Sequence, residues 1–274
     1  MTTDFEALRR AVAADLYIEG SEVEVGEWQS LRGQGTPMET TYELIQKSIR
    51  YPMPSGMVEA QQDIEPNLPW AEDHFQERVS GYPLNPGMTY EYWPWYKGKE
   101  GQGVEEHKAG GRFSHTYMER YWPKHATEEA TGITRRRYPH RGIRYDYGDL
   151  QDLVSLLSKS PYTRQAYLPV WFPEDTGAVH GERVPCSLGY HFLLRNGLLH
   201  CEYSIRSCDF FRHFHNDVYL TVRLVQWVAE KLSMKDAGIG YRVVPGTLKM
   251  NIGSLHVFSA ELRRLEKESR PLPV

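Results

Sequence analysis

Residues 184–220, VPCSLGYHFLLRNGLLHCEYSIRSCDFFRHFHNDVYL, contain all three cysteines of the 274-residue chain. Asn196 and Gly197 separate two apolar, aromatic-rich runs, which favours a β-hairpin closed by a type I′ turn. From Asp217 to Leu232 apolar residues occupy most positions, so we expect a largely buried helix. This stretch therefore predicts a strand, a tight turn, a second strand and a helix in that order.

The segments around this stretch complete the expected fold class. Helical spacing or helix-ending signals mark residues 5–16, 70–79 and 147–161; residues 166–173 fit a strand, and 40–52 and 259–274 fit either a strand or a helix. Residues 82–144 form a long, polar, Gly-rich and irregular region, of a kind that is often functional. Blocks of helices and strands without βαβ alternation predict an α+β fold.

Composition narrows the classes of partner. A net charge of −4 and a pI near 6.3 give no basic bias towards nucleic acid. No apolar run approaches the roughly 20 residues that span a bilayer, and the N-terminus has no apolar signal core. An odd number of cysteines offers no disulfide framework, which favours a reducing cytoplasm. We expect a cytoplasmic chain without a metal site that binds neither nucleic acid nor membrane.

Local sequence leaves the chemistry of the three cysteines open. Cys186 lies at the mouth of a predicted strand, where a cation such as Arg183 or Arg206 would favour its thiolate. Cys201 lies inside a strand and Cys208 follows it, and each of the three can equally be a small buried hydrophobe.

Arginines at two strand ends could hold a phosphate. Arg206 and Ser207 end one predicted strand, and a guanidinium fork with a hydroxyl matches phosphate oxygens. Arg164 begins another strand and could supply a second cation, although each arginine can also be an ordinary surface residue.

Taken in order, these segments resemble the thymidylate synthase superfamily. The ordered set is YTRQAYLPVW, PC before a strand, the NG hairpin, RSCD, an Asn/Asp-led helix, SLHVF and RPLP, with a looser likeness over residues 70–123. The resemblance implies one thymidylate synthase-like domain over residues 1–274, with a large mixed sheet and flanking helices. It also implies a homodimer that acts on a pyrimidine nucleoside monophosphate, with 5,10-methylenetetrahydrofolate as one-carbon donor and a cysteine that adds to C6 of the base.

The resemblance assigns the nucleophile and the phosphate ligands. Cys186 would be the nucleophile, with Cys201 and Cys208 in structural positions. Arg206 and Ser207 would bind phosphate, as would Arg164, donated across the dimer interface. The second arginine that usually follows Arg164 is replaced by Gln165.

It also assigns the folate, sugar and proton-transfer residues. Trp93 and Tyr96 would take the places of two tryptophans near the folate, and Asp209 that of an acid on the base and folate side. His256 would bind a sugar hydroxyl, although Phe258 stands where the family has a tyrosine.

Two further residues would assist proton transfer. Tyr117 would help to remove the C5 proton. Glu72 is favoured over Asp73 and Glu77 as the catalytic glutamate.

One position decides between cytosine and uracil. The methylases carry an asparagine after RSxD and seven more residues, whereas Asp217 is in that register here and Asn216 falls one residue short. A carboxyl group accepts from the N4 amino group of cytosine and, when protonated, donates to N3. The alternative is a slipped register, in which Asn216 reads the base and Asp217 favours a helix N-terminus.

The sequence ends at RPLPV, whereas the methylases continue into a segment that covers the folate and excludes water. We therefore expect water to reach an exocyclic methylene intermediate, so that the product is hydroxymethylated. The leading hypothesis is a cytidylate 5-hydroxymethylase acting on CMP or dCMP, with a slight preference for the ribonucleotide. The alternatives are a dUMP methylase or hydroxymethylase that uses Asn216, and a nucleotide-binding homologue that has lost the reaction.

Overall fold

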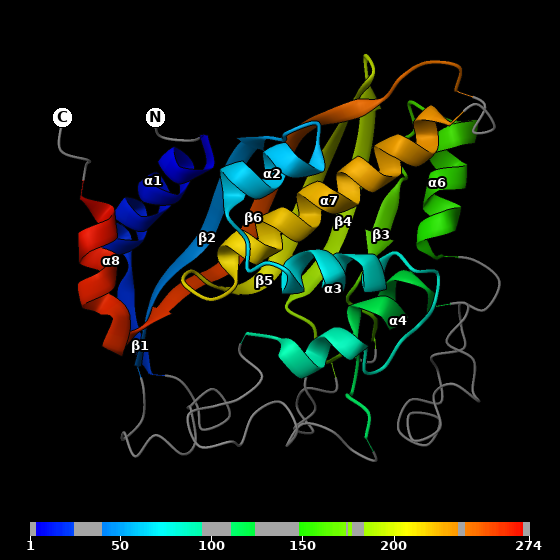
Figure 1. The fold of residues 1–274 in the computed structure, drawn as a ribbon. Coiled ribbons are helices and arrows are strands. Elements are labelled where there is room, and N and C mark those ends of the chain that lie inside the picture. Colours follow the sequence, from blue (N-terminus) through cyan, green and yellow to red (C-terminus); the bar gives the residue numbers. More distant parts are fainter. Residues whose placement is uncertain are drawn as a thin grey trace.

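The computed structural model describes residues 4–24, 40–94, 111–123, 148–173, 175–176, 184–234 and 239–270. A six-stranded sheet with the order β1-β2-β6-β5-β4-β3 dominates the fold, and only its β5–β6 pair is parallel (Figure 1). The strands are β1 (Ser21–Glu24), β2 (Thr40–Pro52), β3 (Tyr167–Pro169), β4 (Ser187–Arg195), β5 (Leu198–Asp209) and β6 (Val244–Phe258). A mixed sheet with flanking helices confirms the predicted α+β class.

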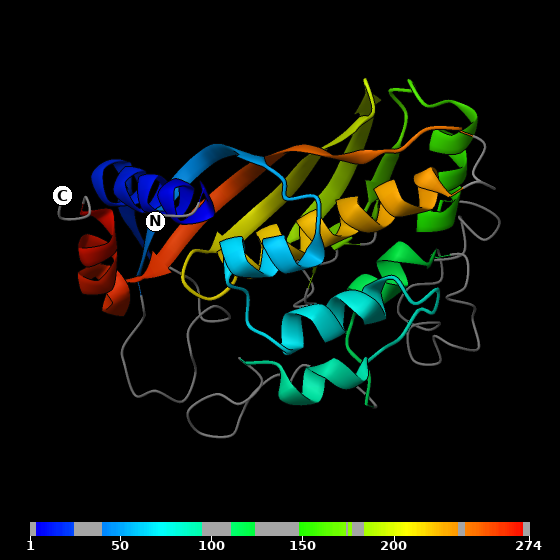
Figure 2. The ribbon, with the colours of Figure 1, turned by 45° about the horizontal axis from the view of Figure 1, so that its top comes forward.

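Helices cover one face of this sheet. The long helix α7 (Phe214–Ser233) runs along it, with α2 (Met57–Ile64) and α3 (Trp70–Arg78) on the same side (Figure 2). The other helices are α1 (Asp4–Glu19), α4 (Tyr117–Tyr121), α6 (Leu150–Lys159) and α8 (Leu262–Ser269), with 3-10 turns η1 (Met88–Tyr92) and η7 (Ser259–Glu261). Across the described part of the chain, no helix has both the length and the apolarity to cross a bilayer.

The predicted hairpin is the β4–β5 pair. Asn196 and Gly197 both have positive φ, 50° and 76°, as a type I′ turn requires. Tyr190 pairs with Tyr203 and Phe192 with Cys201, and all four side chains are buried. The alternating pattern that predicted the strands therefore points its apolar half at α7 and the core.

Strand β6 is central in the sheet, and the sequence did not predict it. Its buried side chains form two alternating sets, Leu248, Met250 and Ile252, then Leu255 and Val257, so the phase changes by one residue between them. The change occurs opposite Gln46 of the partner strand, which has a φ of 56°; the pairing of β2 with β6 keeps the same register on both sides of this point, so no residue is inserted. This phase change breaks the period of two on which strand prediction depends.

At the same point β6 lies close to the end of β5 that carries Arg206. A Cβ at Gly253 would lie 2.8 Å from the carbonyl oxygen of Arg206, so a larger residue would push the two strands apart. The predicted phosphate arginine is therefore placed partly by a glycine on the neighbouring strand.

Helix α7 begins three residues before the predicted start. The Asp209 carboxylate accepts hydrogen bonds from the backbone N–H groups of Phe211 and Arg212, both at 3.0 Å, and orders the turn that leads into the helix. As a result Asp217 lies in the first turn of α7 rather than at its cap.

The opposite face of the sheet has no described helix over its centre (Figure 2). Polar groups occupy it: Glu202 on β5 accepts hydrogen bonds from Asn251 at 2.6 Å and Lys249 at 3.4 Å on β6. Tyr167 of the edge strand β3 is 49% exposed. We call the face that carries Tyr167, Glu202, Lys249 and Asn251 the outer face.

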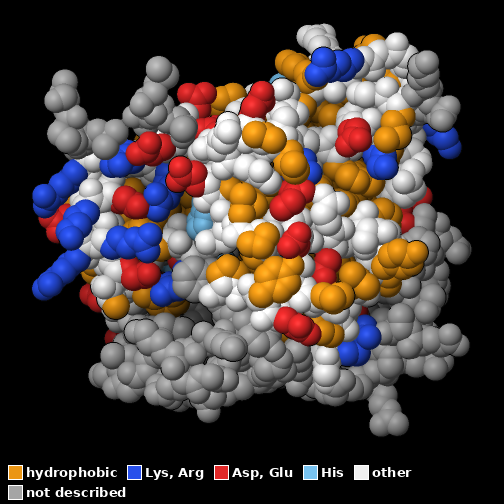
Figure 3. Space-filling model, viewed as in Figure 1, with side chains coloured by type: hydrophobic (Ala, Val, Ile, Leu, Met, Phe, Trp, Pro, Cys, Tyr) orange, Lys and Arg blue, Asp and Glu red, His pale blue; other side chains and the backbone are white. Residues whose placement is uncertain are grey.

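Basic side chains gather over α1 and α8, at the left of Figure 3. Several are paired with acids, as Arg9 is with Glu268 at 2.8 Å and Arg10 with Glu6 at 3.0 Å. The cluster therefore has mixed charge, and exposed ion pairs of this kind contribute little to stability.

Candidate active site

One pocket brings together five of the residues predicted for the site. It lies among α3, α4, the start of β4, the end of β5 and the first turn of α7; α3 and α4 lie side by side below α7 in Figure 1. Its lining includes Cys186, Ser207, Asp217, Tyr117 and Trp93. These residues are up to 124 positions apart in the chain, from Trp93 to Asp217, so only the fold collects them.

Arg206 holds its guanidinium against the thiol of Cys186. Nη2 lies 3.9 Å from Cys186 Sγ, and the side chain is fixed by donating to the carbonyl oxygens of Pro185 (2.9 Å) and Val184 (3.2 Å). Cys186 is half-buried at the pocket wall. A fixed cation beside a thiol favours the thiolate, which is the nucleophilic form.

The other two cysteines are in a different environment. Cys201 and Cys208 are 2% and 1% exposed, and burial raises the pKa of both thiols above the ordinary value. They stay protonated at neutral pH and suit packing rather than attack. Cys208 also contributes a weak hydrogen bond, with its Sγ 3.6 Å from Asp217 Oδ2.

Burial raises the pKa of Asp217 to about 7, opposed in part by the charge of Arg78 and the hydrogen bond from Cys208. At neutral pH the carboxyl group is therefore present in both protonation states. In its protonated form it offers one donor and one acceptor to a ligand in the pocket.

Both N–H groups of the adjacent Asn216 amide are committed to the protein. Its Nδ2 donates to Asn67 Oδ1 at 2.8 Å and to the Arg212 carbonyl at 3.3 Å, while its Oδ1 accepts from the Asn67 N–H at 3.0 Å. Asn216 is 2% exposed. Asn216 also lines the pocket, but a ligand could accept from its amide only by breaking one of those hydrogen bonds, whereas Asp217 needs no such rearrangement.

The raised pKa of Asp217 predicts a pH-dependent stability. Because the folded-state pKa of about 7 exceeds the ordinary 3.8, proton binding favours the folded state; this contribution is full below about pH 4 and is lost as pH rises through 7. Asp217→Asn should therefore gain stability over the wild type between these limits, reaching at most about 4 kcal/mol at pH 8. Urea unfolding of both proteins at pH 4 and pH 8 measures this gain, and a pH-independent difference would contradict the assignment.

Tyr117 is hydrogen-bonded to the first residue of β4, the strand that follows Cys186. Ser187 Oγ donates to the Tyr117 hydroxyl at 3.2 Å and lies 2.6 Å from the Tyr203 hydroxyl. The guanidinium of Arg78 lies over the Tyr117 ring, 4.0 Å from its centroid. Burial raises the pKa of Tyr117, so its hydroxyl stays protonated and can relay a proton but does not carry a charge.

Glu72, the favoured candidate for the catalytic glutamate, lies outside this pocket. Its carboxylate binds Arg223 through two hydrogen bonds of 2.9 Å and accepts from the Tyr219 hydroxyl at 2.6 Å. These partners from α7 hold the carboxylate away from Cys186 and lower its pKa despite burial. The structure thus places Glu72 in the packing of α3 against α7 and not among the residues that line the pocket with Cys186.

Asp209 and His256 are likewise not among the pocket-lining residues. Besides capping the turn before α7, the Asp209 carboxylate pairs with Arg212 at 2.7 Å, so the chain already uses both of its oxygens. His256 faces Asp209 across the β5–β6 pair, and burial lowers its pKa. The structure gives Asp209 a structural task, and it places His256 beside that cluster.

Neither Arg164 nor Tyr96, two of the predicted ligands, is among the pocket-lining residues that the structure describes. Arg164 is exposed just before β3 and does not line the pocket of its own chain. Tyr96 lies outside the described residues, as does Arg183.

Sequence reasoning missed three pocket residues on α3. Trp70, His74 and Arg78 are spaced by four residues, so they share one face of the helix, and all three line the pocket. They are 7%, 2% and 6% exposed. Their spacing in the predicted helix 70–79 was the available signal, but two of the three residue types are polar and do not resemble a buried stripe.

Aromatic rings form a continuous wall along this pocket. Trp93 stacks on His213 at 5.9 Å and contacts Trp70 at 6.4 Å, and Trp70 in turn stacks on His74 at 5.0 Å. Trp70 Nε1 is buried and has no hydrogen-bond partner among the described residues. A flat heteroaromatic ligand with an acceptor atom would fit such a wall.

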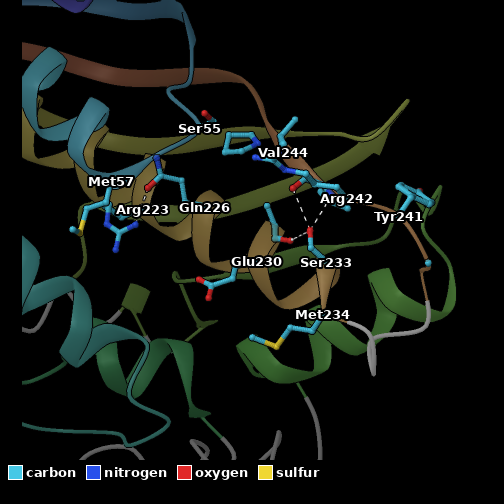
Figure 4. Close-up of a pocket in the computed structure, with 14 residues that line it drawn as sticks. Ser55, Met57, Arg223, Gln226, Glu230, Ser233, Met234, Tyr241, Arg242 and Val244 are labelled. Carbon is cyan, nitrogen blue, oxygen red and sulfur yellow. Dashed lines mark hydrogen bonds between the residues drawn. The ribbon is translucent and has the colours of Figure 1, made fainter.

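A larger groove lies towards the other end of α7 and holds none of the predicted residues. Its volume is about 870 Å³, against about 180 Å³ for the pocket with Cys186. Figure 4 shows Arg223, Glu230, Ser233 and Arg242 around it. Because it contains neither a cysteine nor a buried acid, chemistry and not size identifies the smaller pocket as the candidate active site.

Comparison with known proteins matches residues 95–273 to the family model described as thymidylate synthase. The chain belongs to the thymidylate synthase family. The family match covers about two thirds of the chain and includes Cys186, Arg206 and Asp217. It therefore confirms the resemblance that was drawn from the ordered motifs.

Individual relatives of the family are distant. A protein of Methanococcoides burtonii provisionally named a thymidylate synthase is 24% identical over 157 residues, 57% of this chain and 67% of that protein. The thymidylate synthase of Baumannia cicadellinicola is 25% identical over 129 residues, 45% of this chain, and the chain spans only 44% of that enzyme. The thermostable thymidylate synthase A from Bacillus subtilis superimposes with a TM-score of 0.65 at 17% identity, over 97% of this chain and 83% of that one. This last likeness establishes the thymidylate synthase-like fold.

Proposed function

We propose that this protein is a pyrimidine C5 one-carbon transferase that hydroxymethylates a cytidylate, CMP or dCMP, with 5,10-methylenetetrahydrofolate. The observation that carries the proposal is the pair of neighbours at the start of α7. Both residues line the cavity, but Asp217 has a pKa of about 7, whereas both N–H groups of the Asn216 amide already donate to Asn67 and Arg212. The protonated carboxyl can accept from N4 and donate to N3 of cytosine, whereas the carboxylate can only accept and would meet the lone pairs of O4 in uracil.

Cys186 and Tyr117 supply the covalent chemistry in this proposal. The thiolate, favoured by Arg206, adds to C6 of the base and makes C5 nucleophilic. Tyr117 helps to remove the C5 proton; its hydroxyl accepts a hydrogen bond from Ser187, the residue that follows Cys186 in the sequence. Release of the thiolate from C6 at the end restores the aromatic ring.

The phosphate is assigned to Arg206, Ser207 and an arginine from a second copy of the chain. Ser207 lines the pocket, and the guanidinium of Arg206 lies 3.9 Å from the thiol of Cys186 at the pocket wall. Arg164 is exposed at the edge of the sheet and suits donation to a partner. The outer face, which no described helix covers at its centre, is the surface we assign to the homodimer interface.

The aromatic wall is where the folate would be held. Trp93 and Trp70 offer flat surfaces, and the unpaired Trp70 Nε1–H suits an acceptor on a pterin ring. Bound there, the folate supplies a one-carbon unit at the oxidation level of formaldehyde. We retain His256 for the sugar and Asp209 for the folate side only as indirect contributors, through the turn that Asp209 caps and that leads into α7.

The identity of the products tests this proposal. With CMP or dCMP and methylenetetrahydrofolate, mass spectrometry is expected to find a 5-hydroxymethyl nucleotide, and the absorbance of dihydrofolate is not expected to rise. Methyl product together with dihydrofolate from dUMP would identify a thymidylate synthase instead. Tight nucleotide binding without any product would identify a homologue that has lost the reaction.

A further inference from the structure

A hydrogen-bonded chain leads from an acid on α3 to a histidine in the pocket. The Thr89 hydroxyl donates to Glu77 Oε2, and the Thr89 N–H donates to Glu77 Oε1 at 3.0 Å. The same hydroxyl oxygen lies 3.0 Å from His74 Nδ1. Glu77, Thr89 and His74 therefore form a relay that ends at the pocket wall.

The relay fixes the tautomer of His74. A hydroxyl has one proton to donate, and here it goes to Glu77, so the oxygen of Thr89 must accept from Nδ1–H of His74. Nε2 is then the unprotonated nitrogen of the ring; burial and the charge of Arg78 lower the pKa of His74 to about 4, so the ring is neutral at pH 7. Stacking on Trp70, with ring planes 14° apart, holds the ring orientation.

A buried cation lies one helical turn further along the same face. Arg78 Nε has no hydrogen-bond partner among the described residues, although the side chain is only 6% exposed and lines the pocket. A buried N–H group without an acceptor lowers the stability of the fold unless a ligand or a water molecule accepts a hydrogen bond from it. Together, Nε2 of His74 and Nε–H of Arg78 offer one acceptor and one donor, which is what a single water molecule can satisfy.

We propose that His74 and Arg78 hold the water that hydrates the exocyclic methylene, and that His74 Nε2 takes its proton. This inference rests on the proposed hydroxymethylation. Glu77 and Thr89 act as positioning residues that stabilise the imidazolium as it forms, because Thr89 accepts from Nδ1–H and in turn donates to the carboxylate of Glu77. A relay of this kind would take over the general-base task for which the sequence favoured Glu72.

The atoms of the step balance without an oxidant or a reductant. The water oxygen bonds to the methylene carbon, and one water proton passes to His74 Nε2. The electron pair of the exocyclic double bond moves into the ring, then forms the C5–C6 double bond as the C6–S bond breaks. Cys186 leaves as a thiolate, and the proton on His74 passes to solvent.

Run in reverse, the same step exchanges the hydroxyl oxygen of the product with water. Wild-type enzyme without folate is therefore expected to incorporate heavy oxygen from labelled water into 5-hydroxymethyl-CMP. It is also expected to exchange the C5 proton of CMP, a reaction that needs Cys186 but no added water. Absence of both exchanges in the wild type would refute the proposed function and not merely the role of His74.

His74→Phe keeps a ring to stack on Trp70 but removes both nitrogens, and His74→Gln keeps an acceptor that cannot serve as an efficient base. Both variants should slow oxygen exchange by about 10²–10⁴-fold relative to their own C5 exchange, the usual range for a general base. Thr89→Val and Glu77→Gln should slow oxygen exchange by about tenfold, because these residues position His74 and do not contact the water themselves.

Asp73→Asn is the matched control. Asp73 also lies on α3 and accepts a hydrogen bond from a hydroxyl of η1, that of Tyr92 at 2.9 Å, but it has no link to His74. Its ratio of oxygen exchange to C5 exchange should equal that of the wild type. An unchanged ratio in both His74 variants would overturn the inference, because a structural histidine would affect the two exchanges alike.

Discussion

Asp217→Asn is expected to move the base preference of the enzyme from cytosine to uracil. An amide donates to O4 and accepts from N3–H of uracil, while towards cytosine it cannot both accept from N4 and donate to N3 without a rearrangement. A site that loses such a matched pair rejects the old ligand by about 10³–10⁴-fold in favourable cases. The measurement is kcat/KM for CMP, dCMP, UMP and dUMP with wild-type and variant enzymes.

Asn216→Asp is the matched comparison, because it changes the neighbouring residue in the opposite chemical direction. Its new carboxylate would face Asn67 Oδ1 and the Arg212 carbonyl oxygen, which now accept from the amide. We expect a loss of about 1–3 kcal/mol in the free energy of unfolding and an unchanged base preference. A variant of Asn216 that alters base preference, beside an Asp217→Asn enzyme that keeps it, would reverse the assignment of the two residues.

Cys186→Ala is expected to abolish turnover while nucleotide binding persists. The covalent adduct at C6 cannot form without the thiolate, so kcat should fall by at least about 10⁴-fold. This variant keeps the proposed phosphate ligands, Arg206 and Ser207, and the base contact at Asp217. The dissociation constant for CMP, measured by calorimetry, should therefore change by less than about tenfold.

Cys201→Ala provides the control for this change. Cys201 is buried on β5 with a thiol that stays protonated, and its loss removes only packing. We expect a stability loss of about 1–2 kcal/mol and wild-type turnover per folded molecule. Turnover that survives in Cys186→Ala, or disappears in Cys201→Ala with the fold intact, would move the nucleophile to another residue.

Much of the fold could be predicted from residues 184–232. The hairpin follows from Asn196 and Gly197, which tolerate positive φ, and the buried helix that follows is evident from its apolar residues. Strand β6 could not be predicted, because its alternation changes phase opposite Gln46 and its burial depends on neighbours on both sides. Local patterns predict elements only where the period is unbroken.

Site residues could be predicted where they belong to one of the motifs that occur in a fixed order along the chain. They could not be predicted where tertiary contacts decide their role. Cys186, Ser207 and Asp217 lie in such motifs and share the pocket. Glu72 looked equivalent to Glu77 in sequence, but Arg223 from a distant helix binds it, whereas Thr89 connects Glu77 to the pocket. Which acid serves a site depends on the partners that the fold provides.

The central claim, that Asp217 makes this family member a cytidylate enzyme, is tested most directly by release of deuterium from C5. CMP, dCMP, UMP and dUMP, each deuterated at C5, are incubated separately with enzyme and methylenetetrahydrofolate. We predict release from CMP or dCMP at rates about 10³-fold or more above those from the uracil nucleotides. Release from dUMP alone would contradict the account and return the base contact to Asn216.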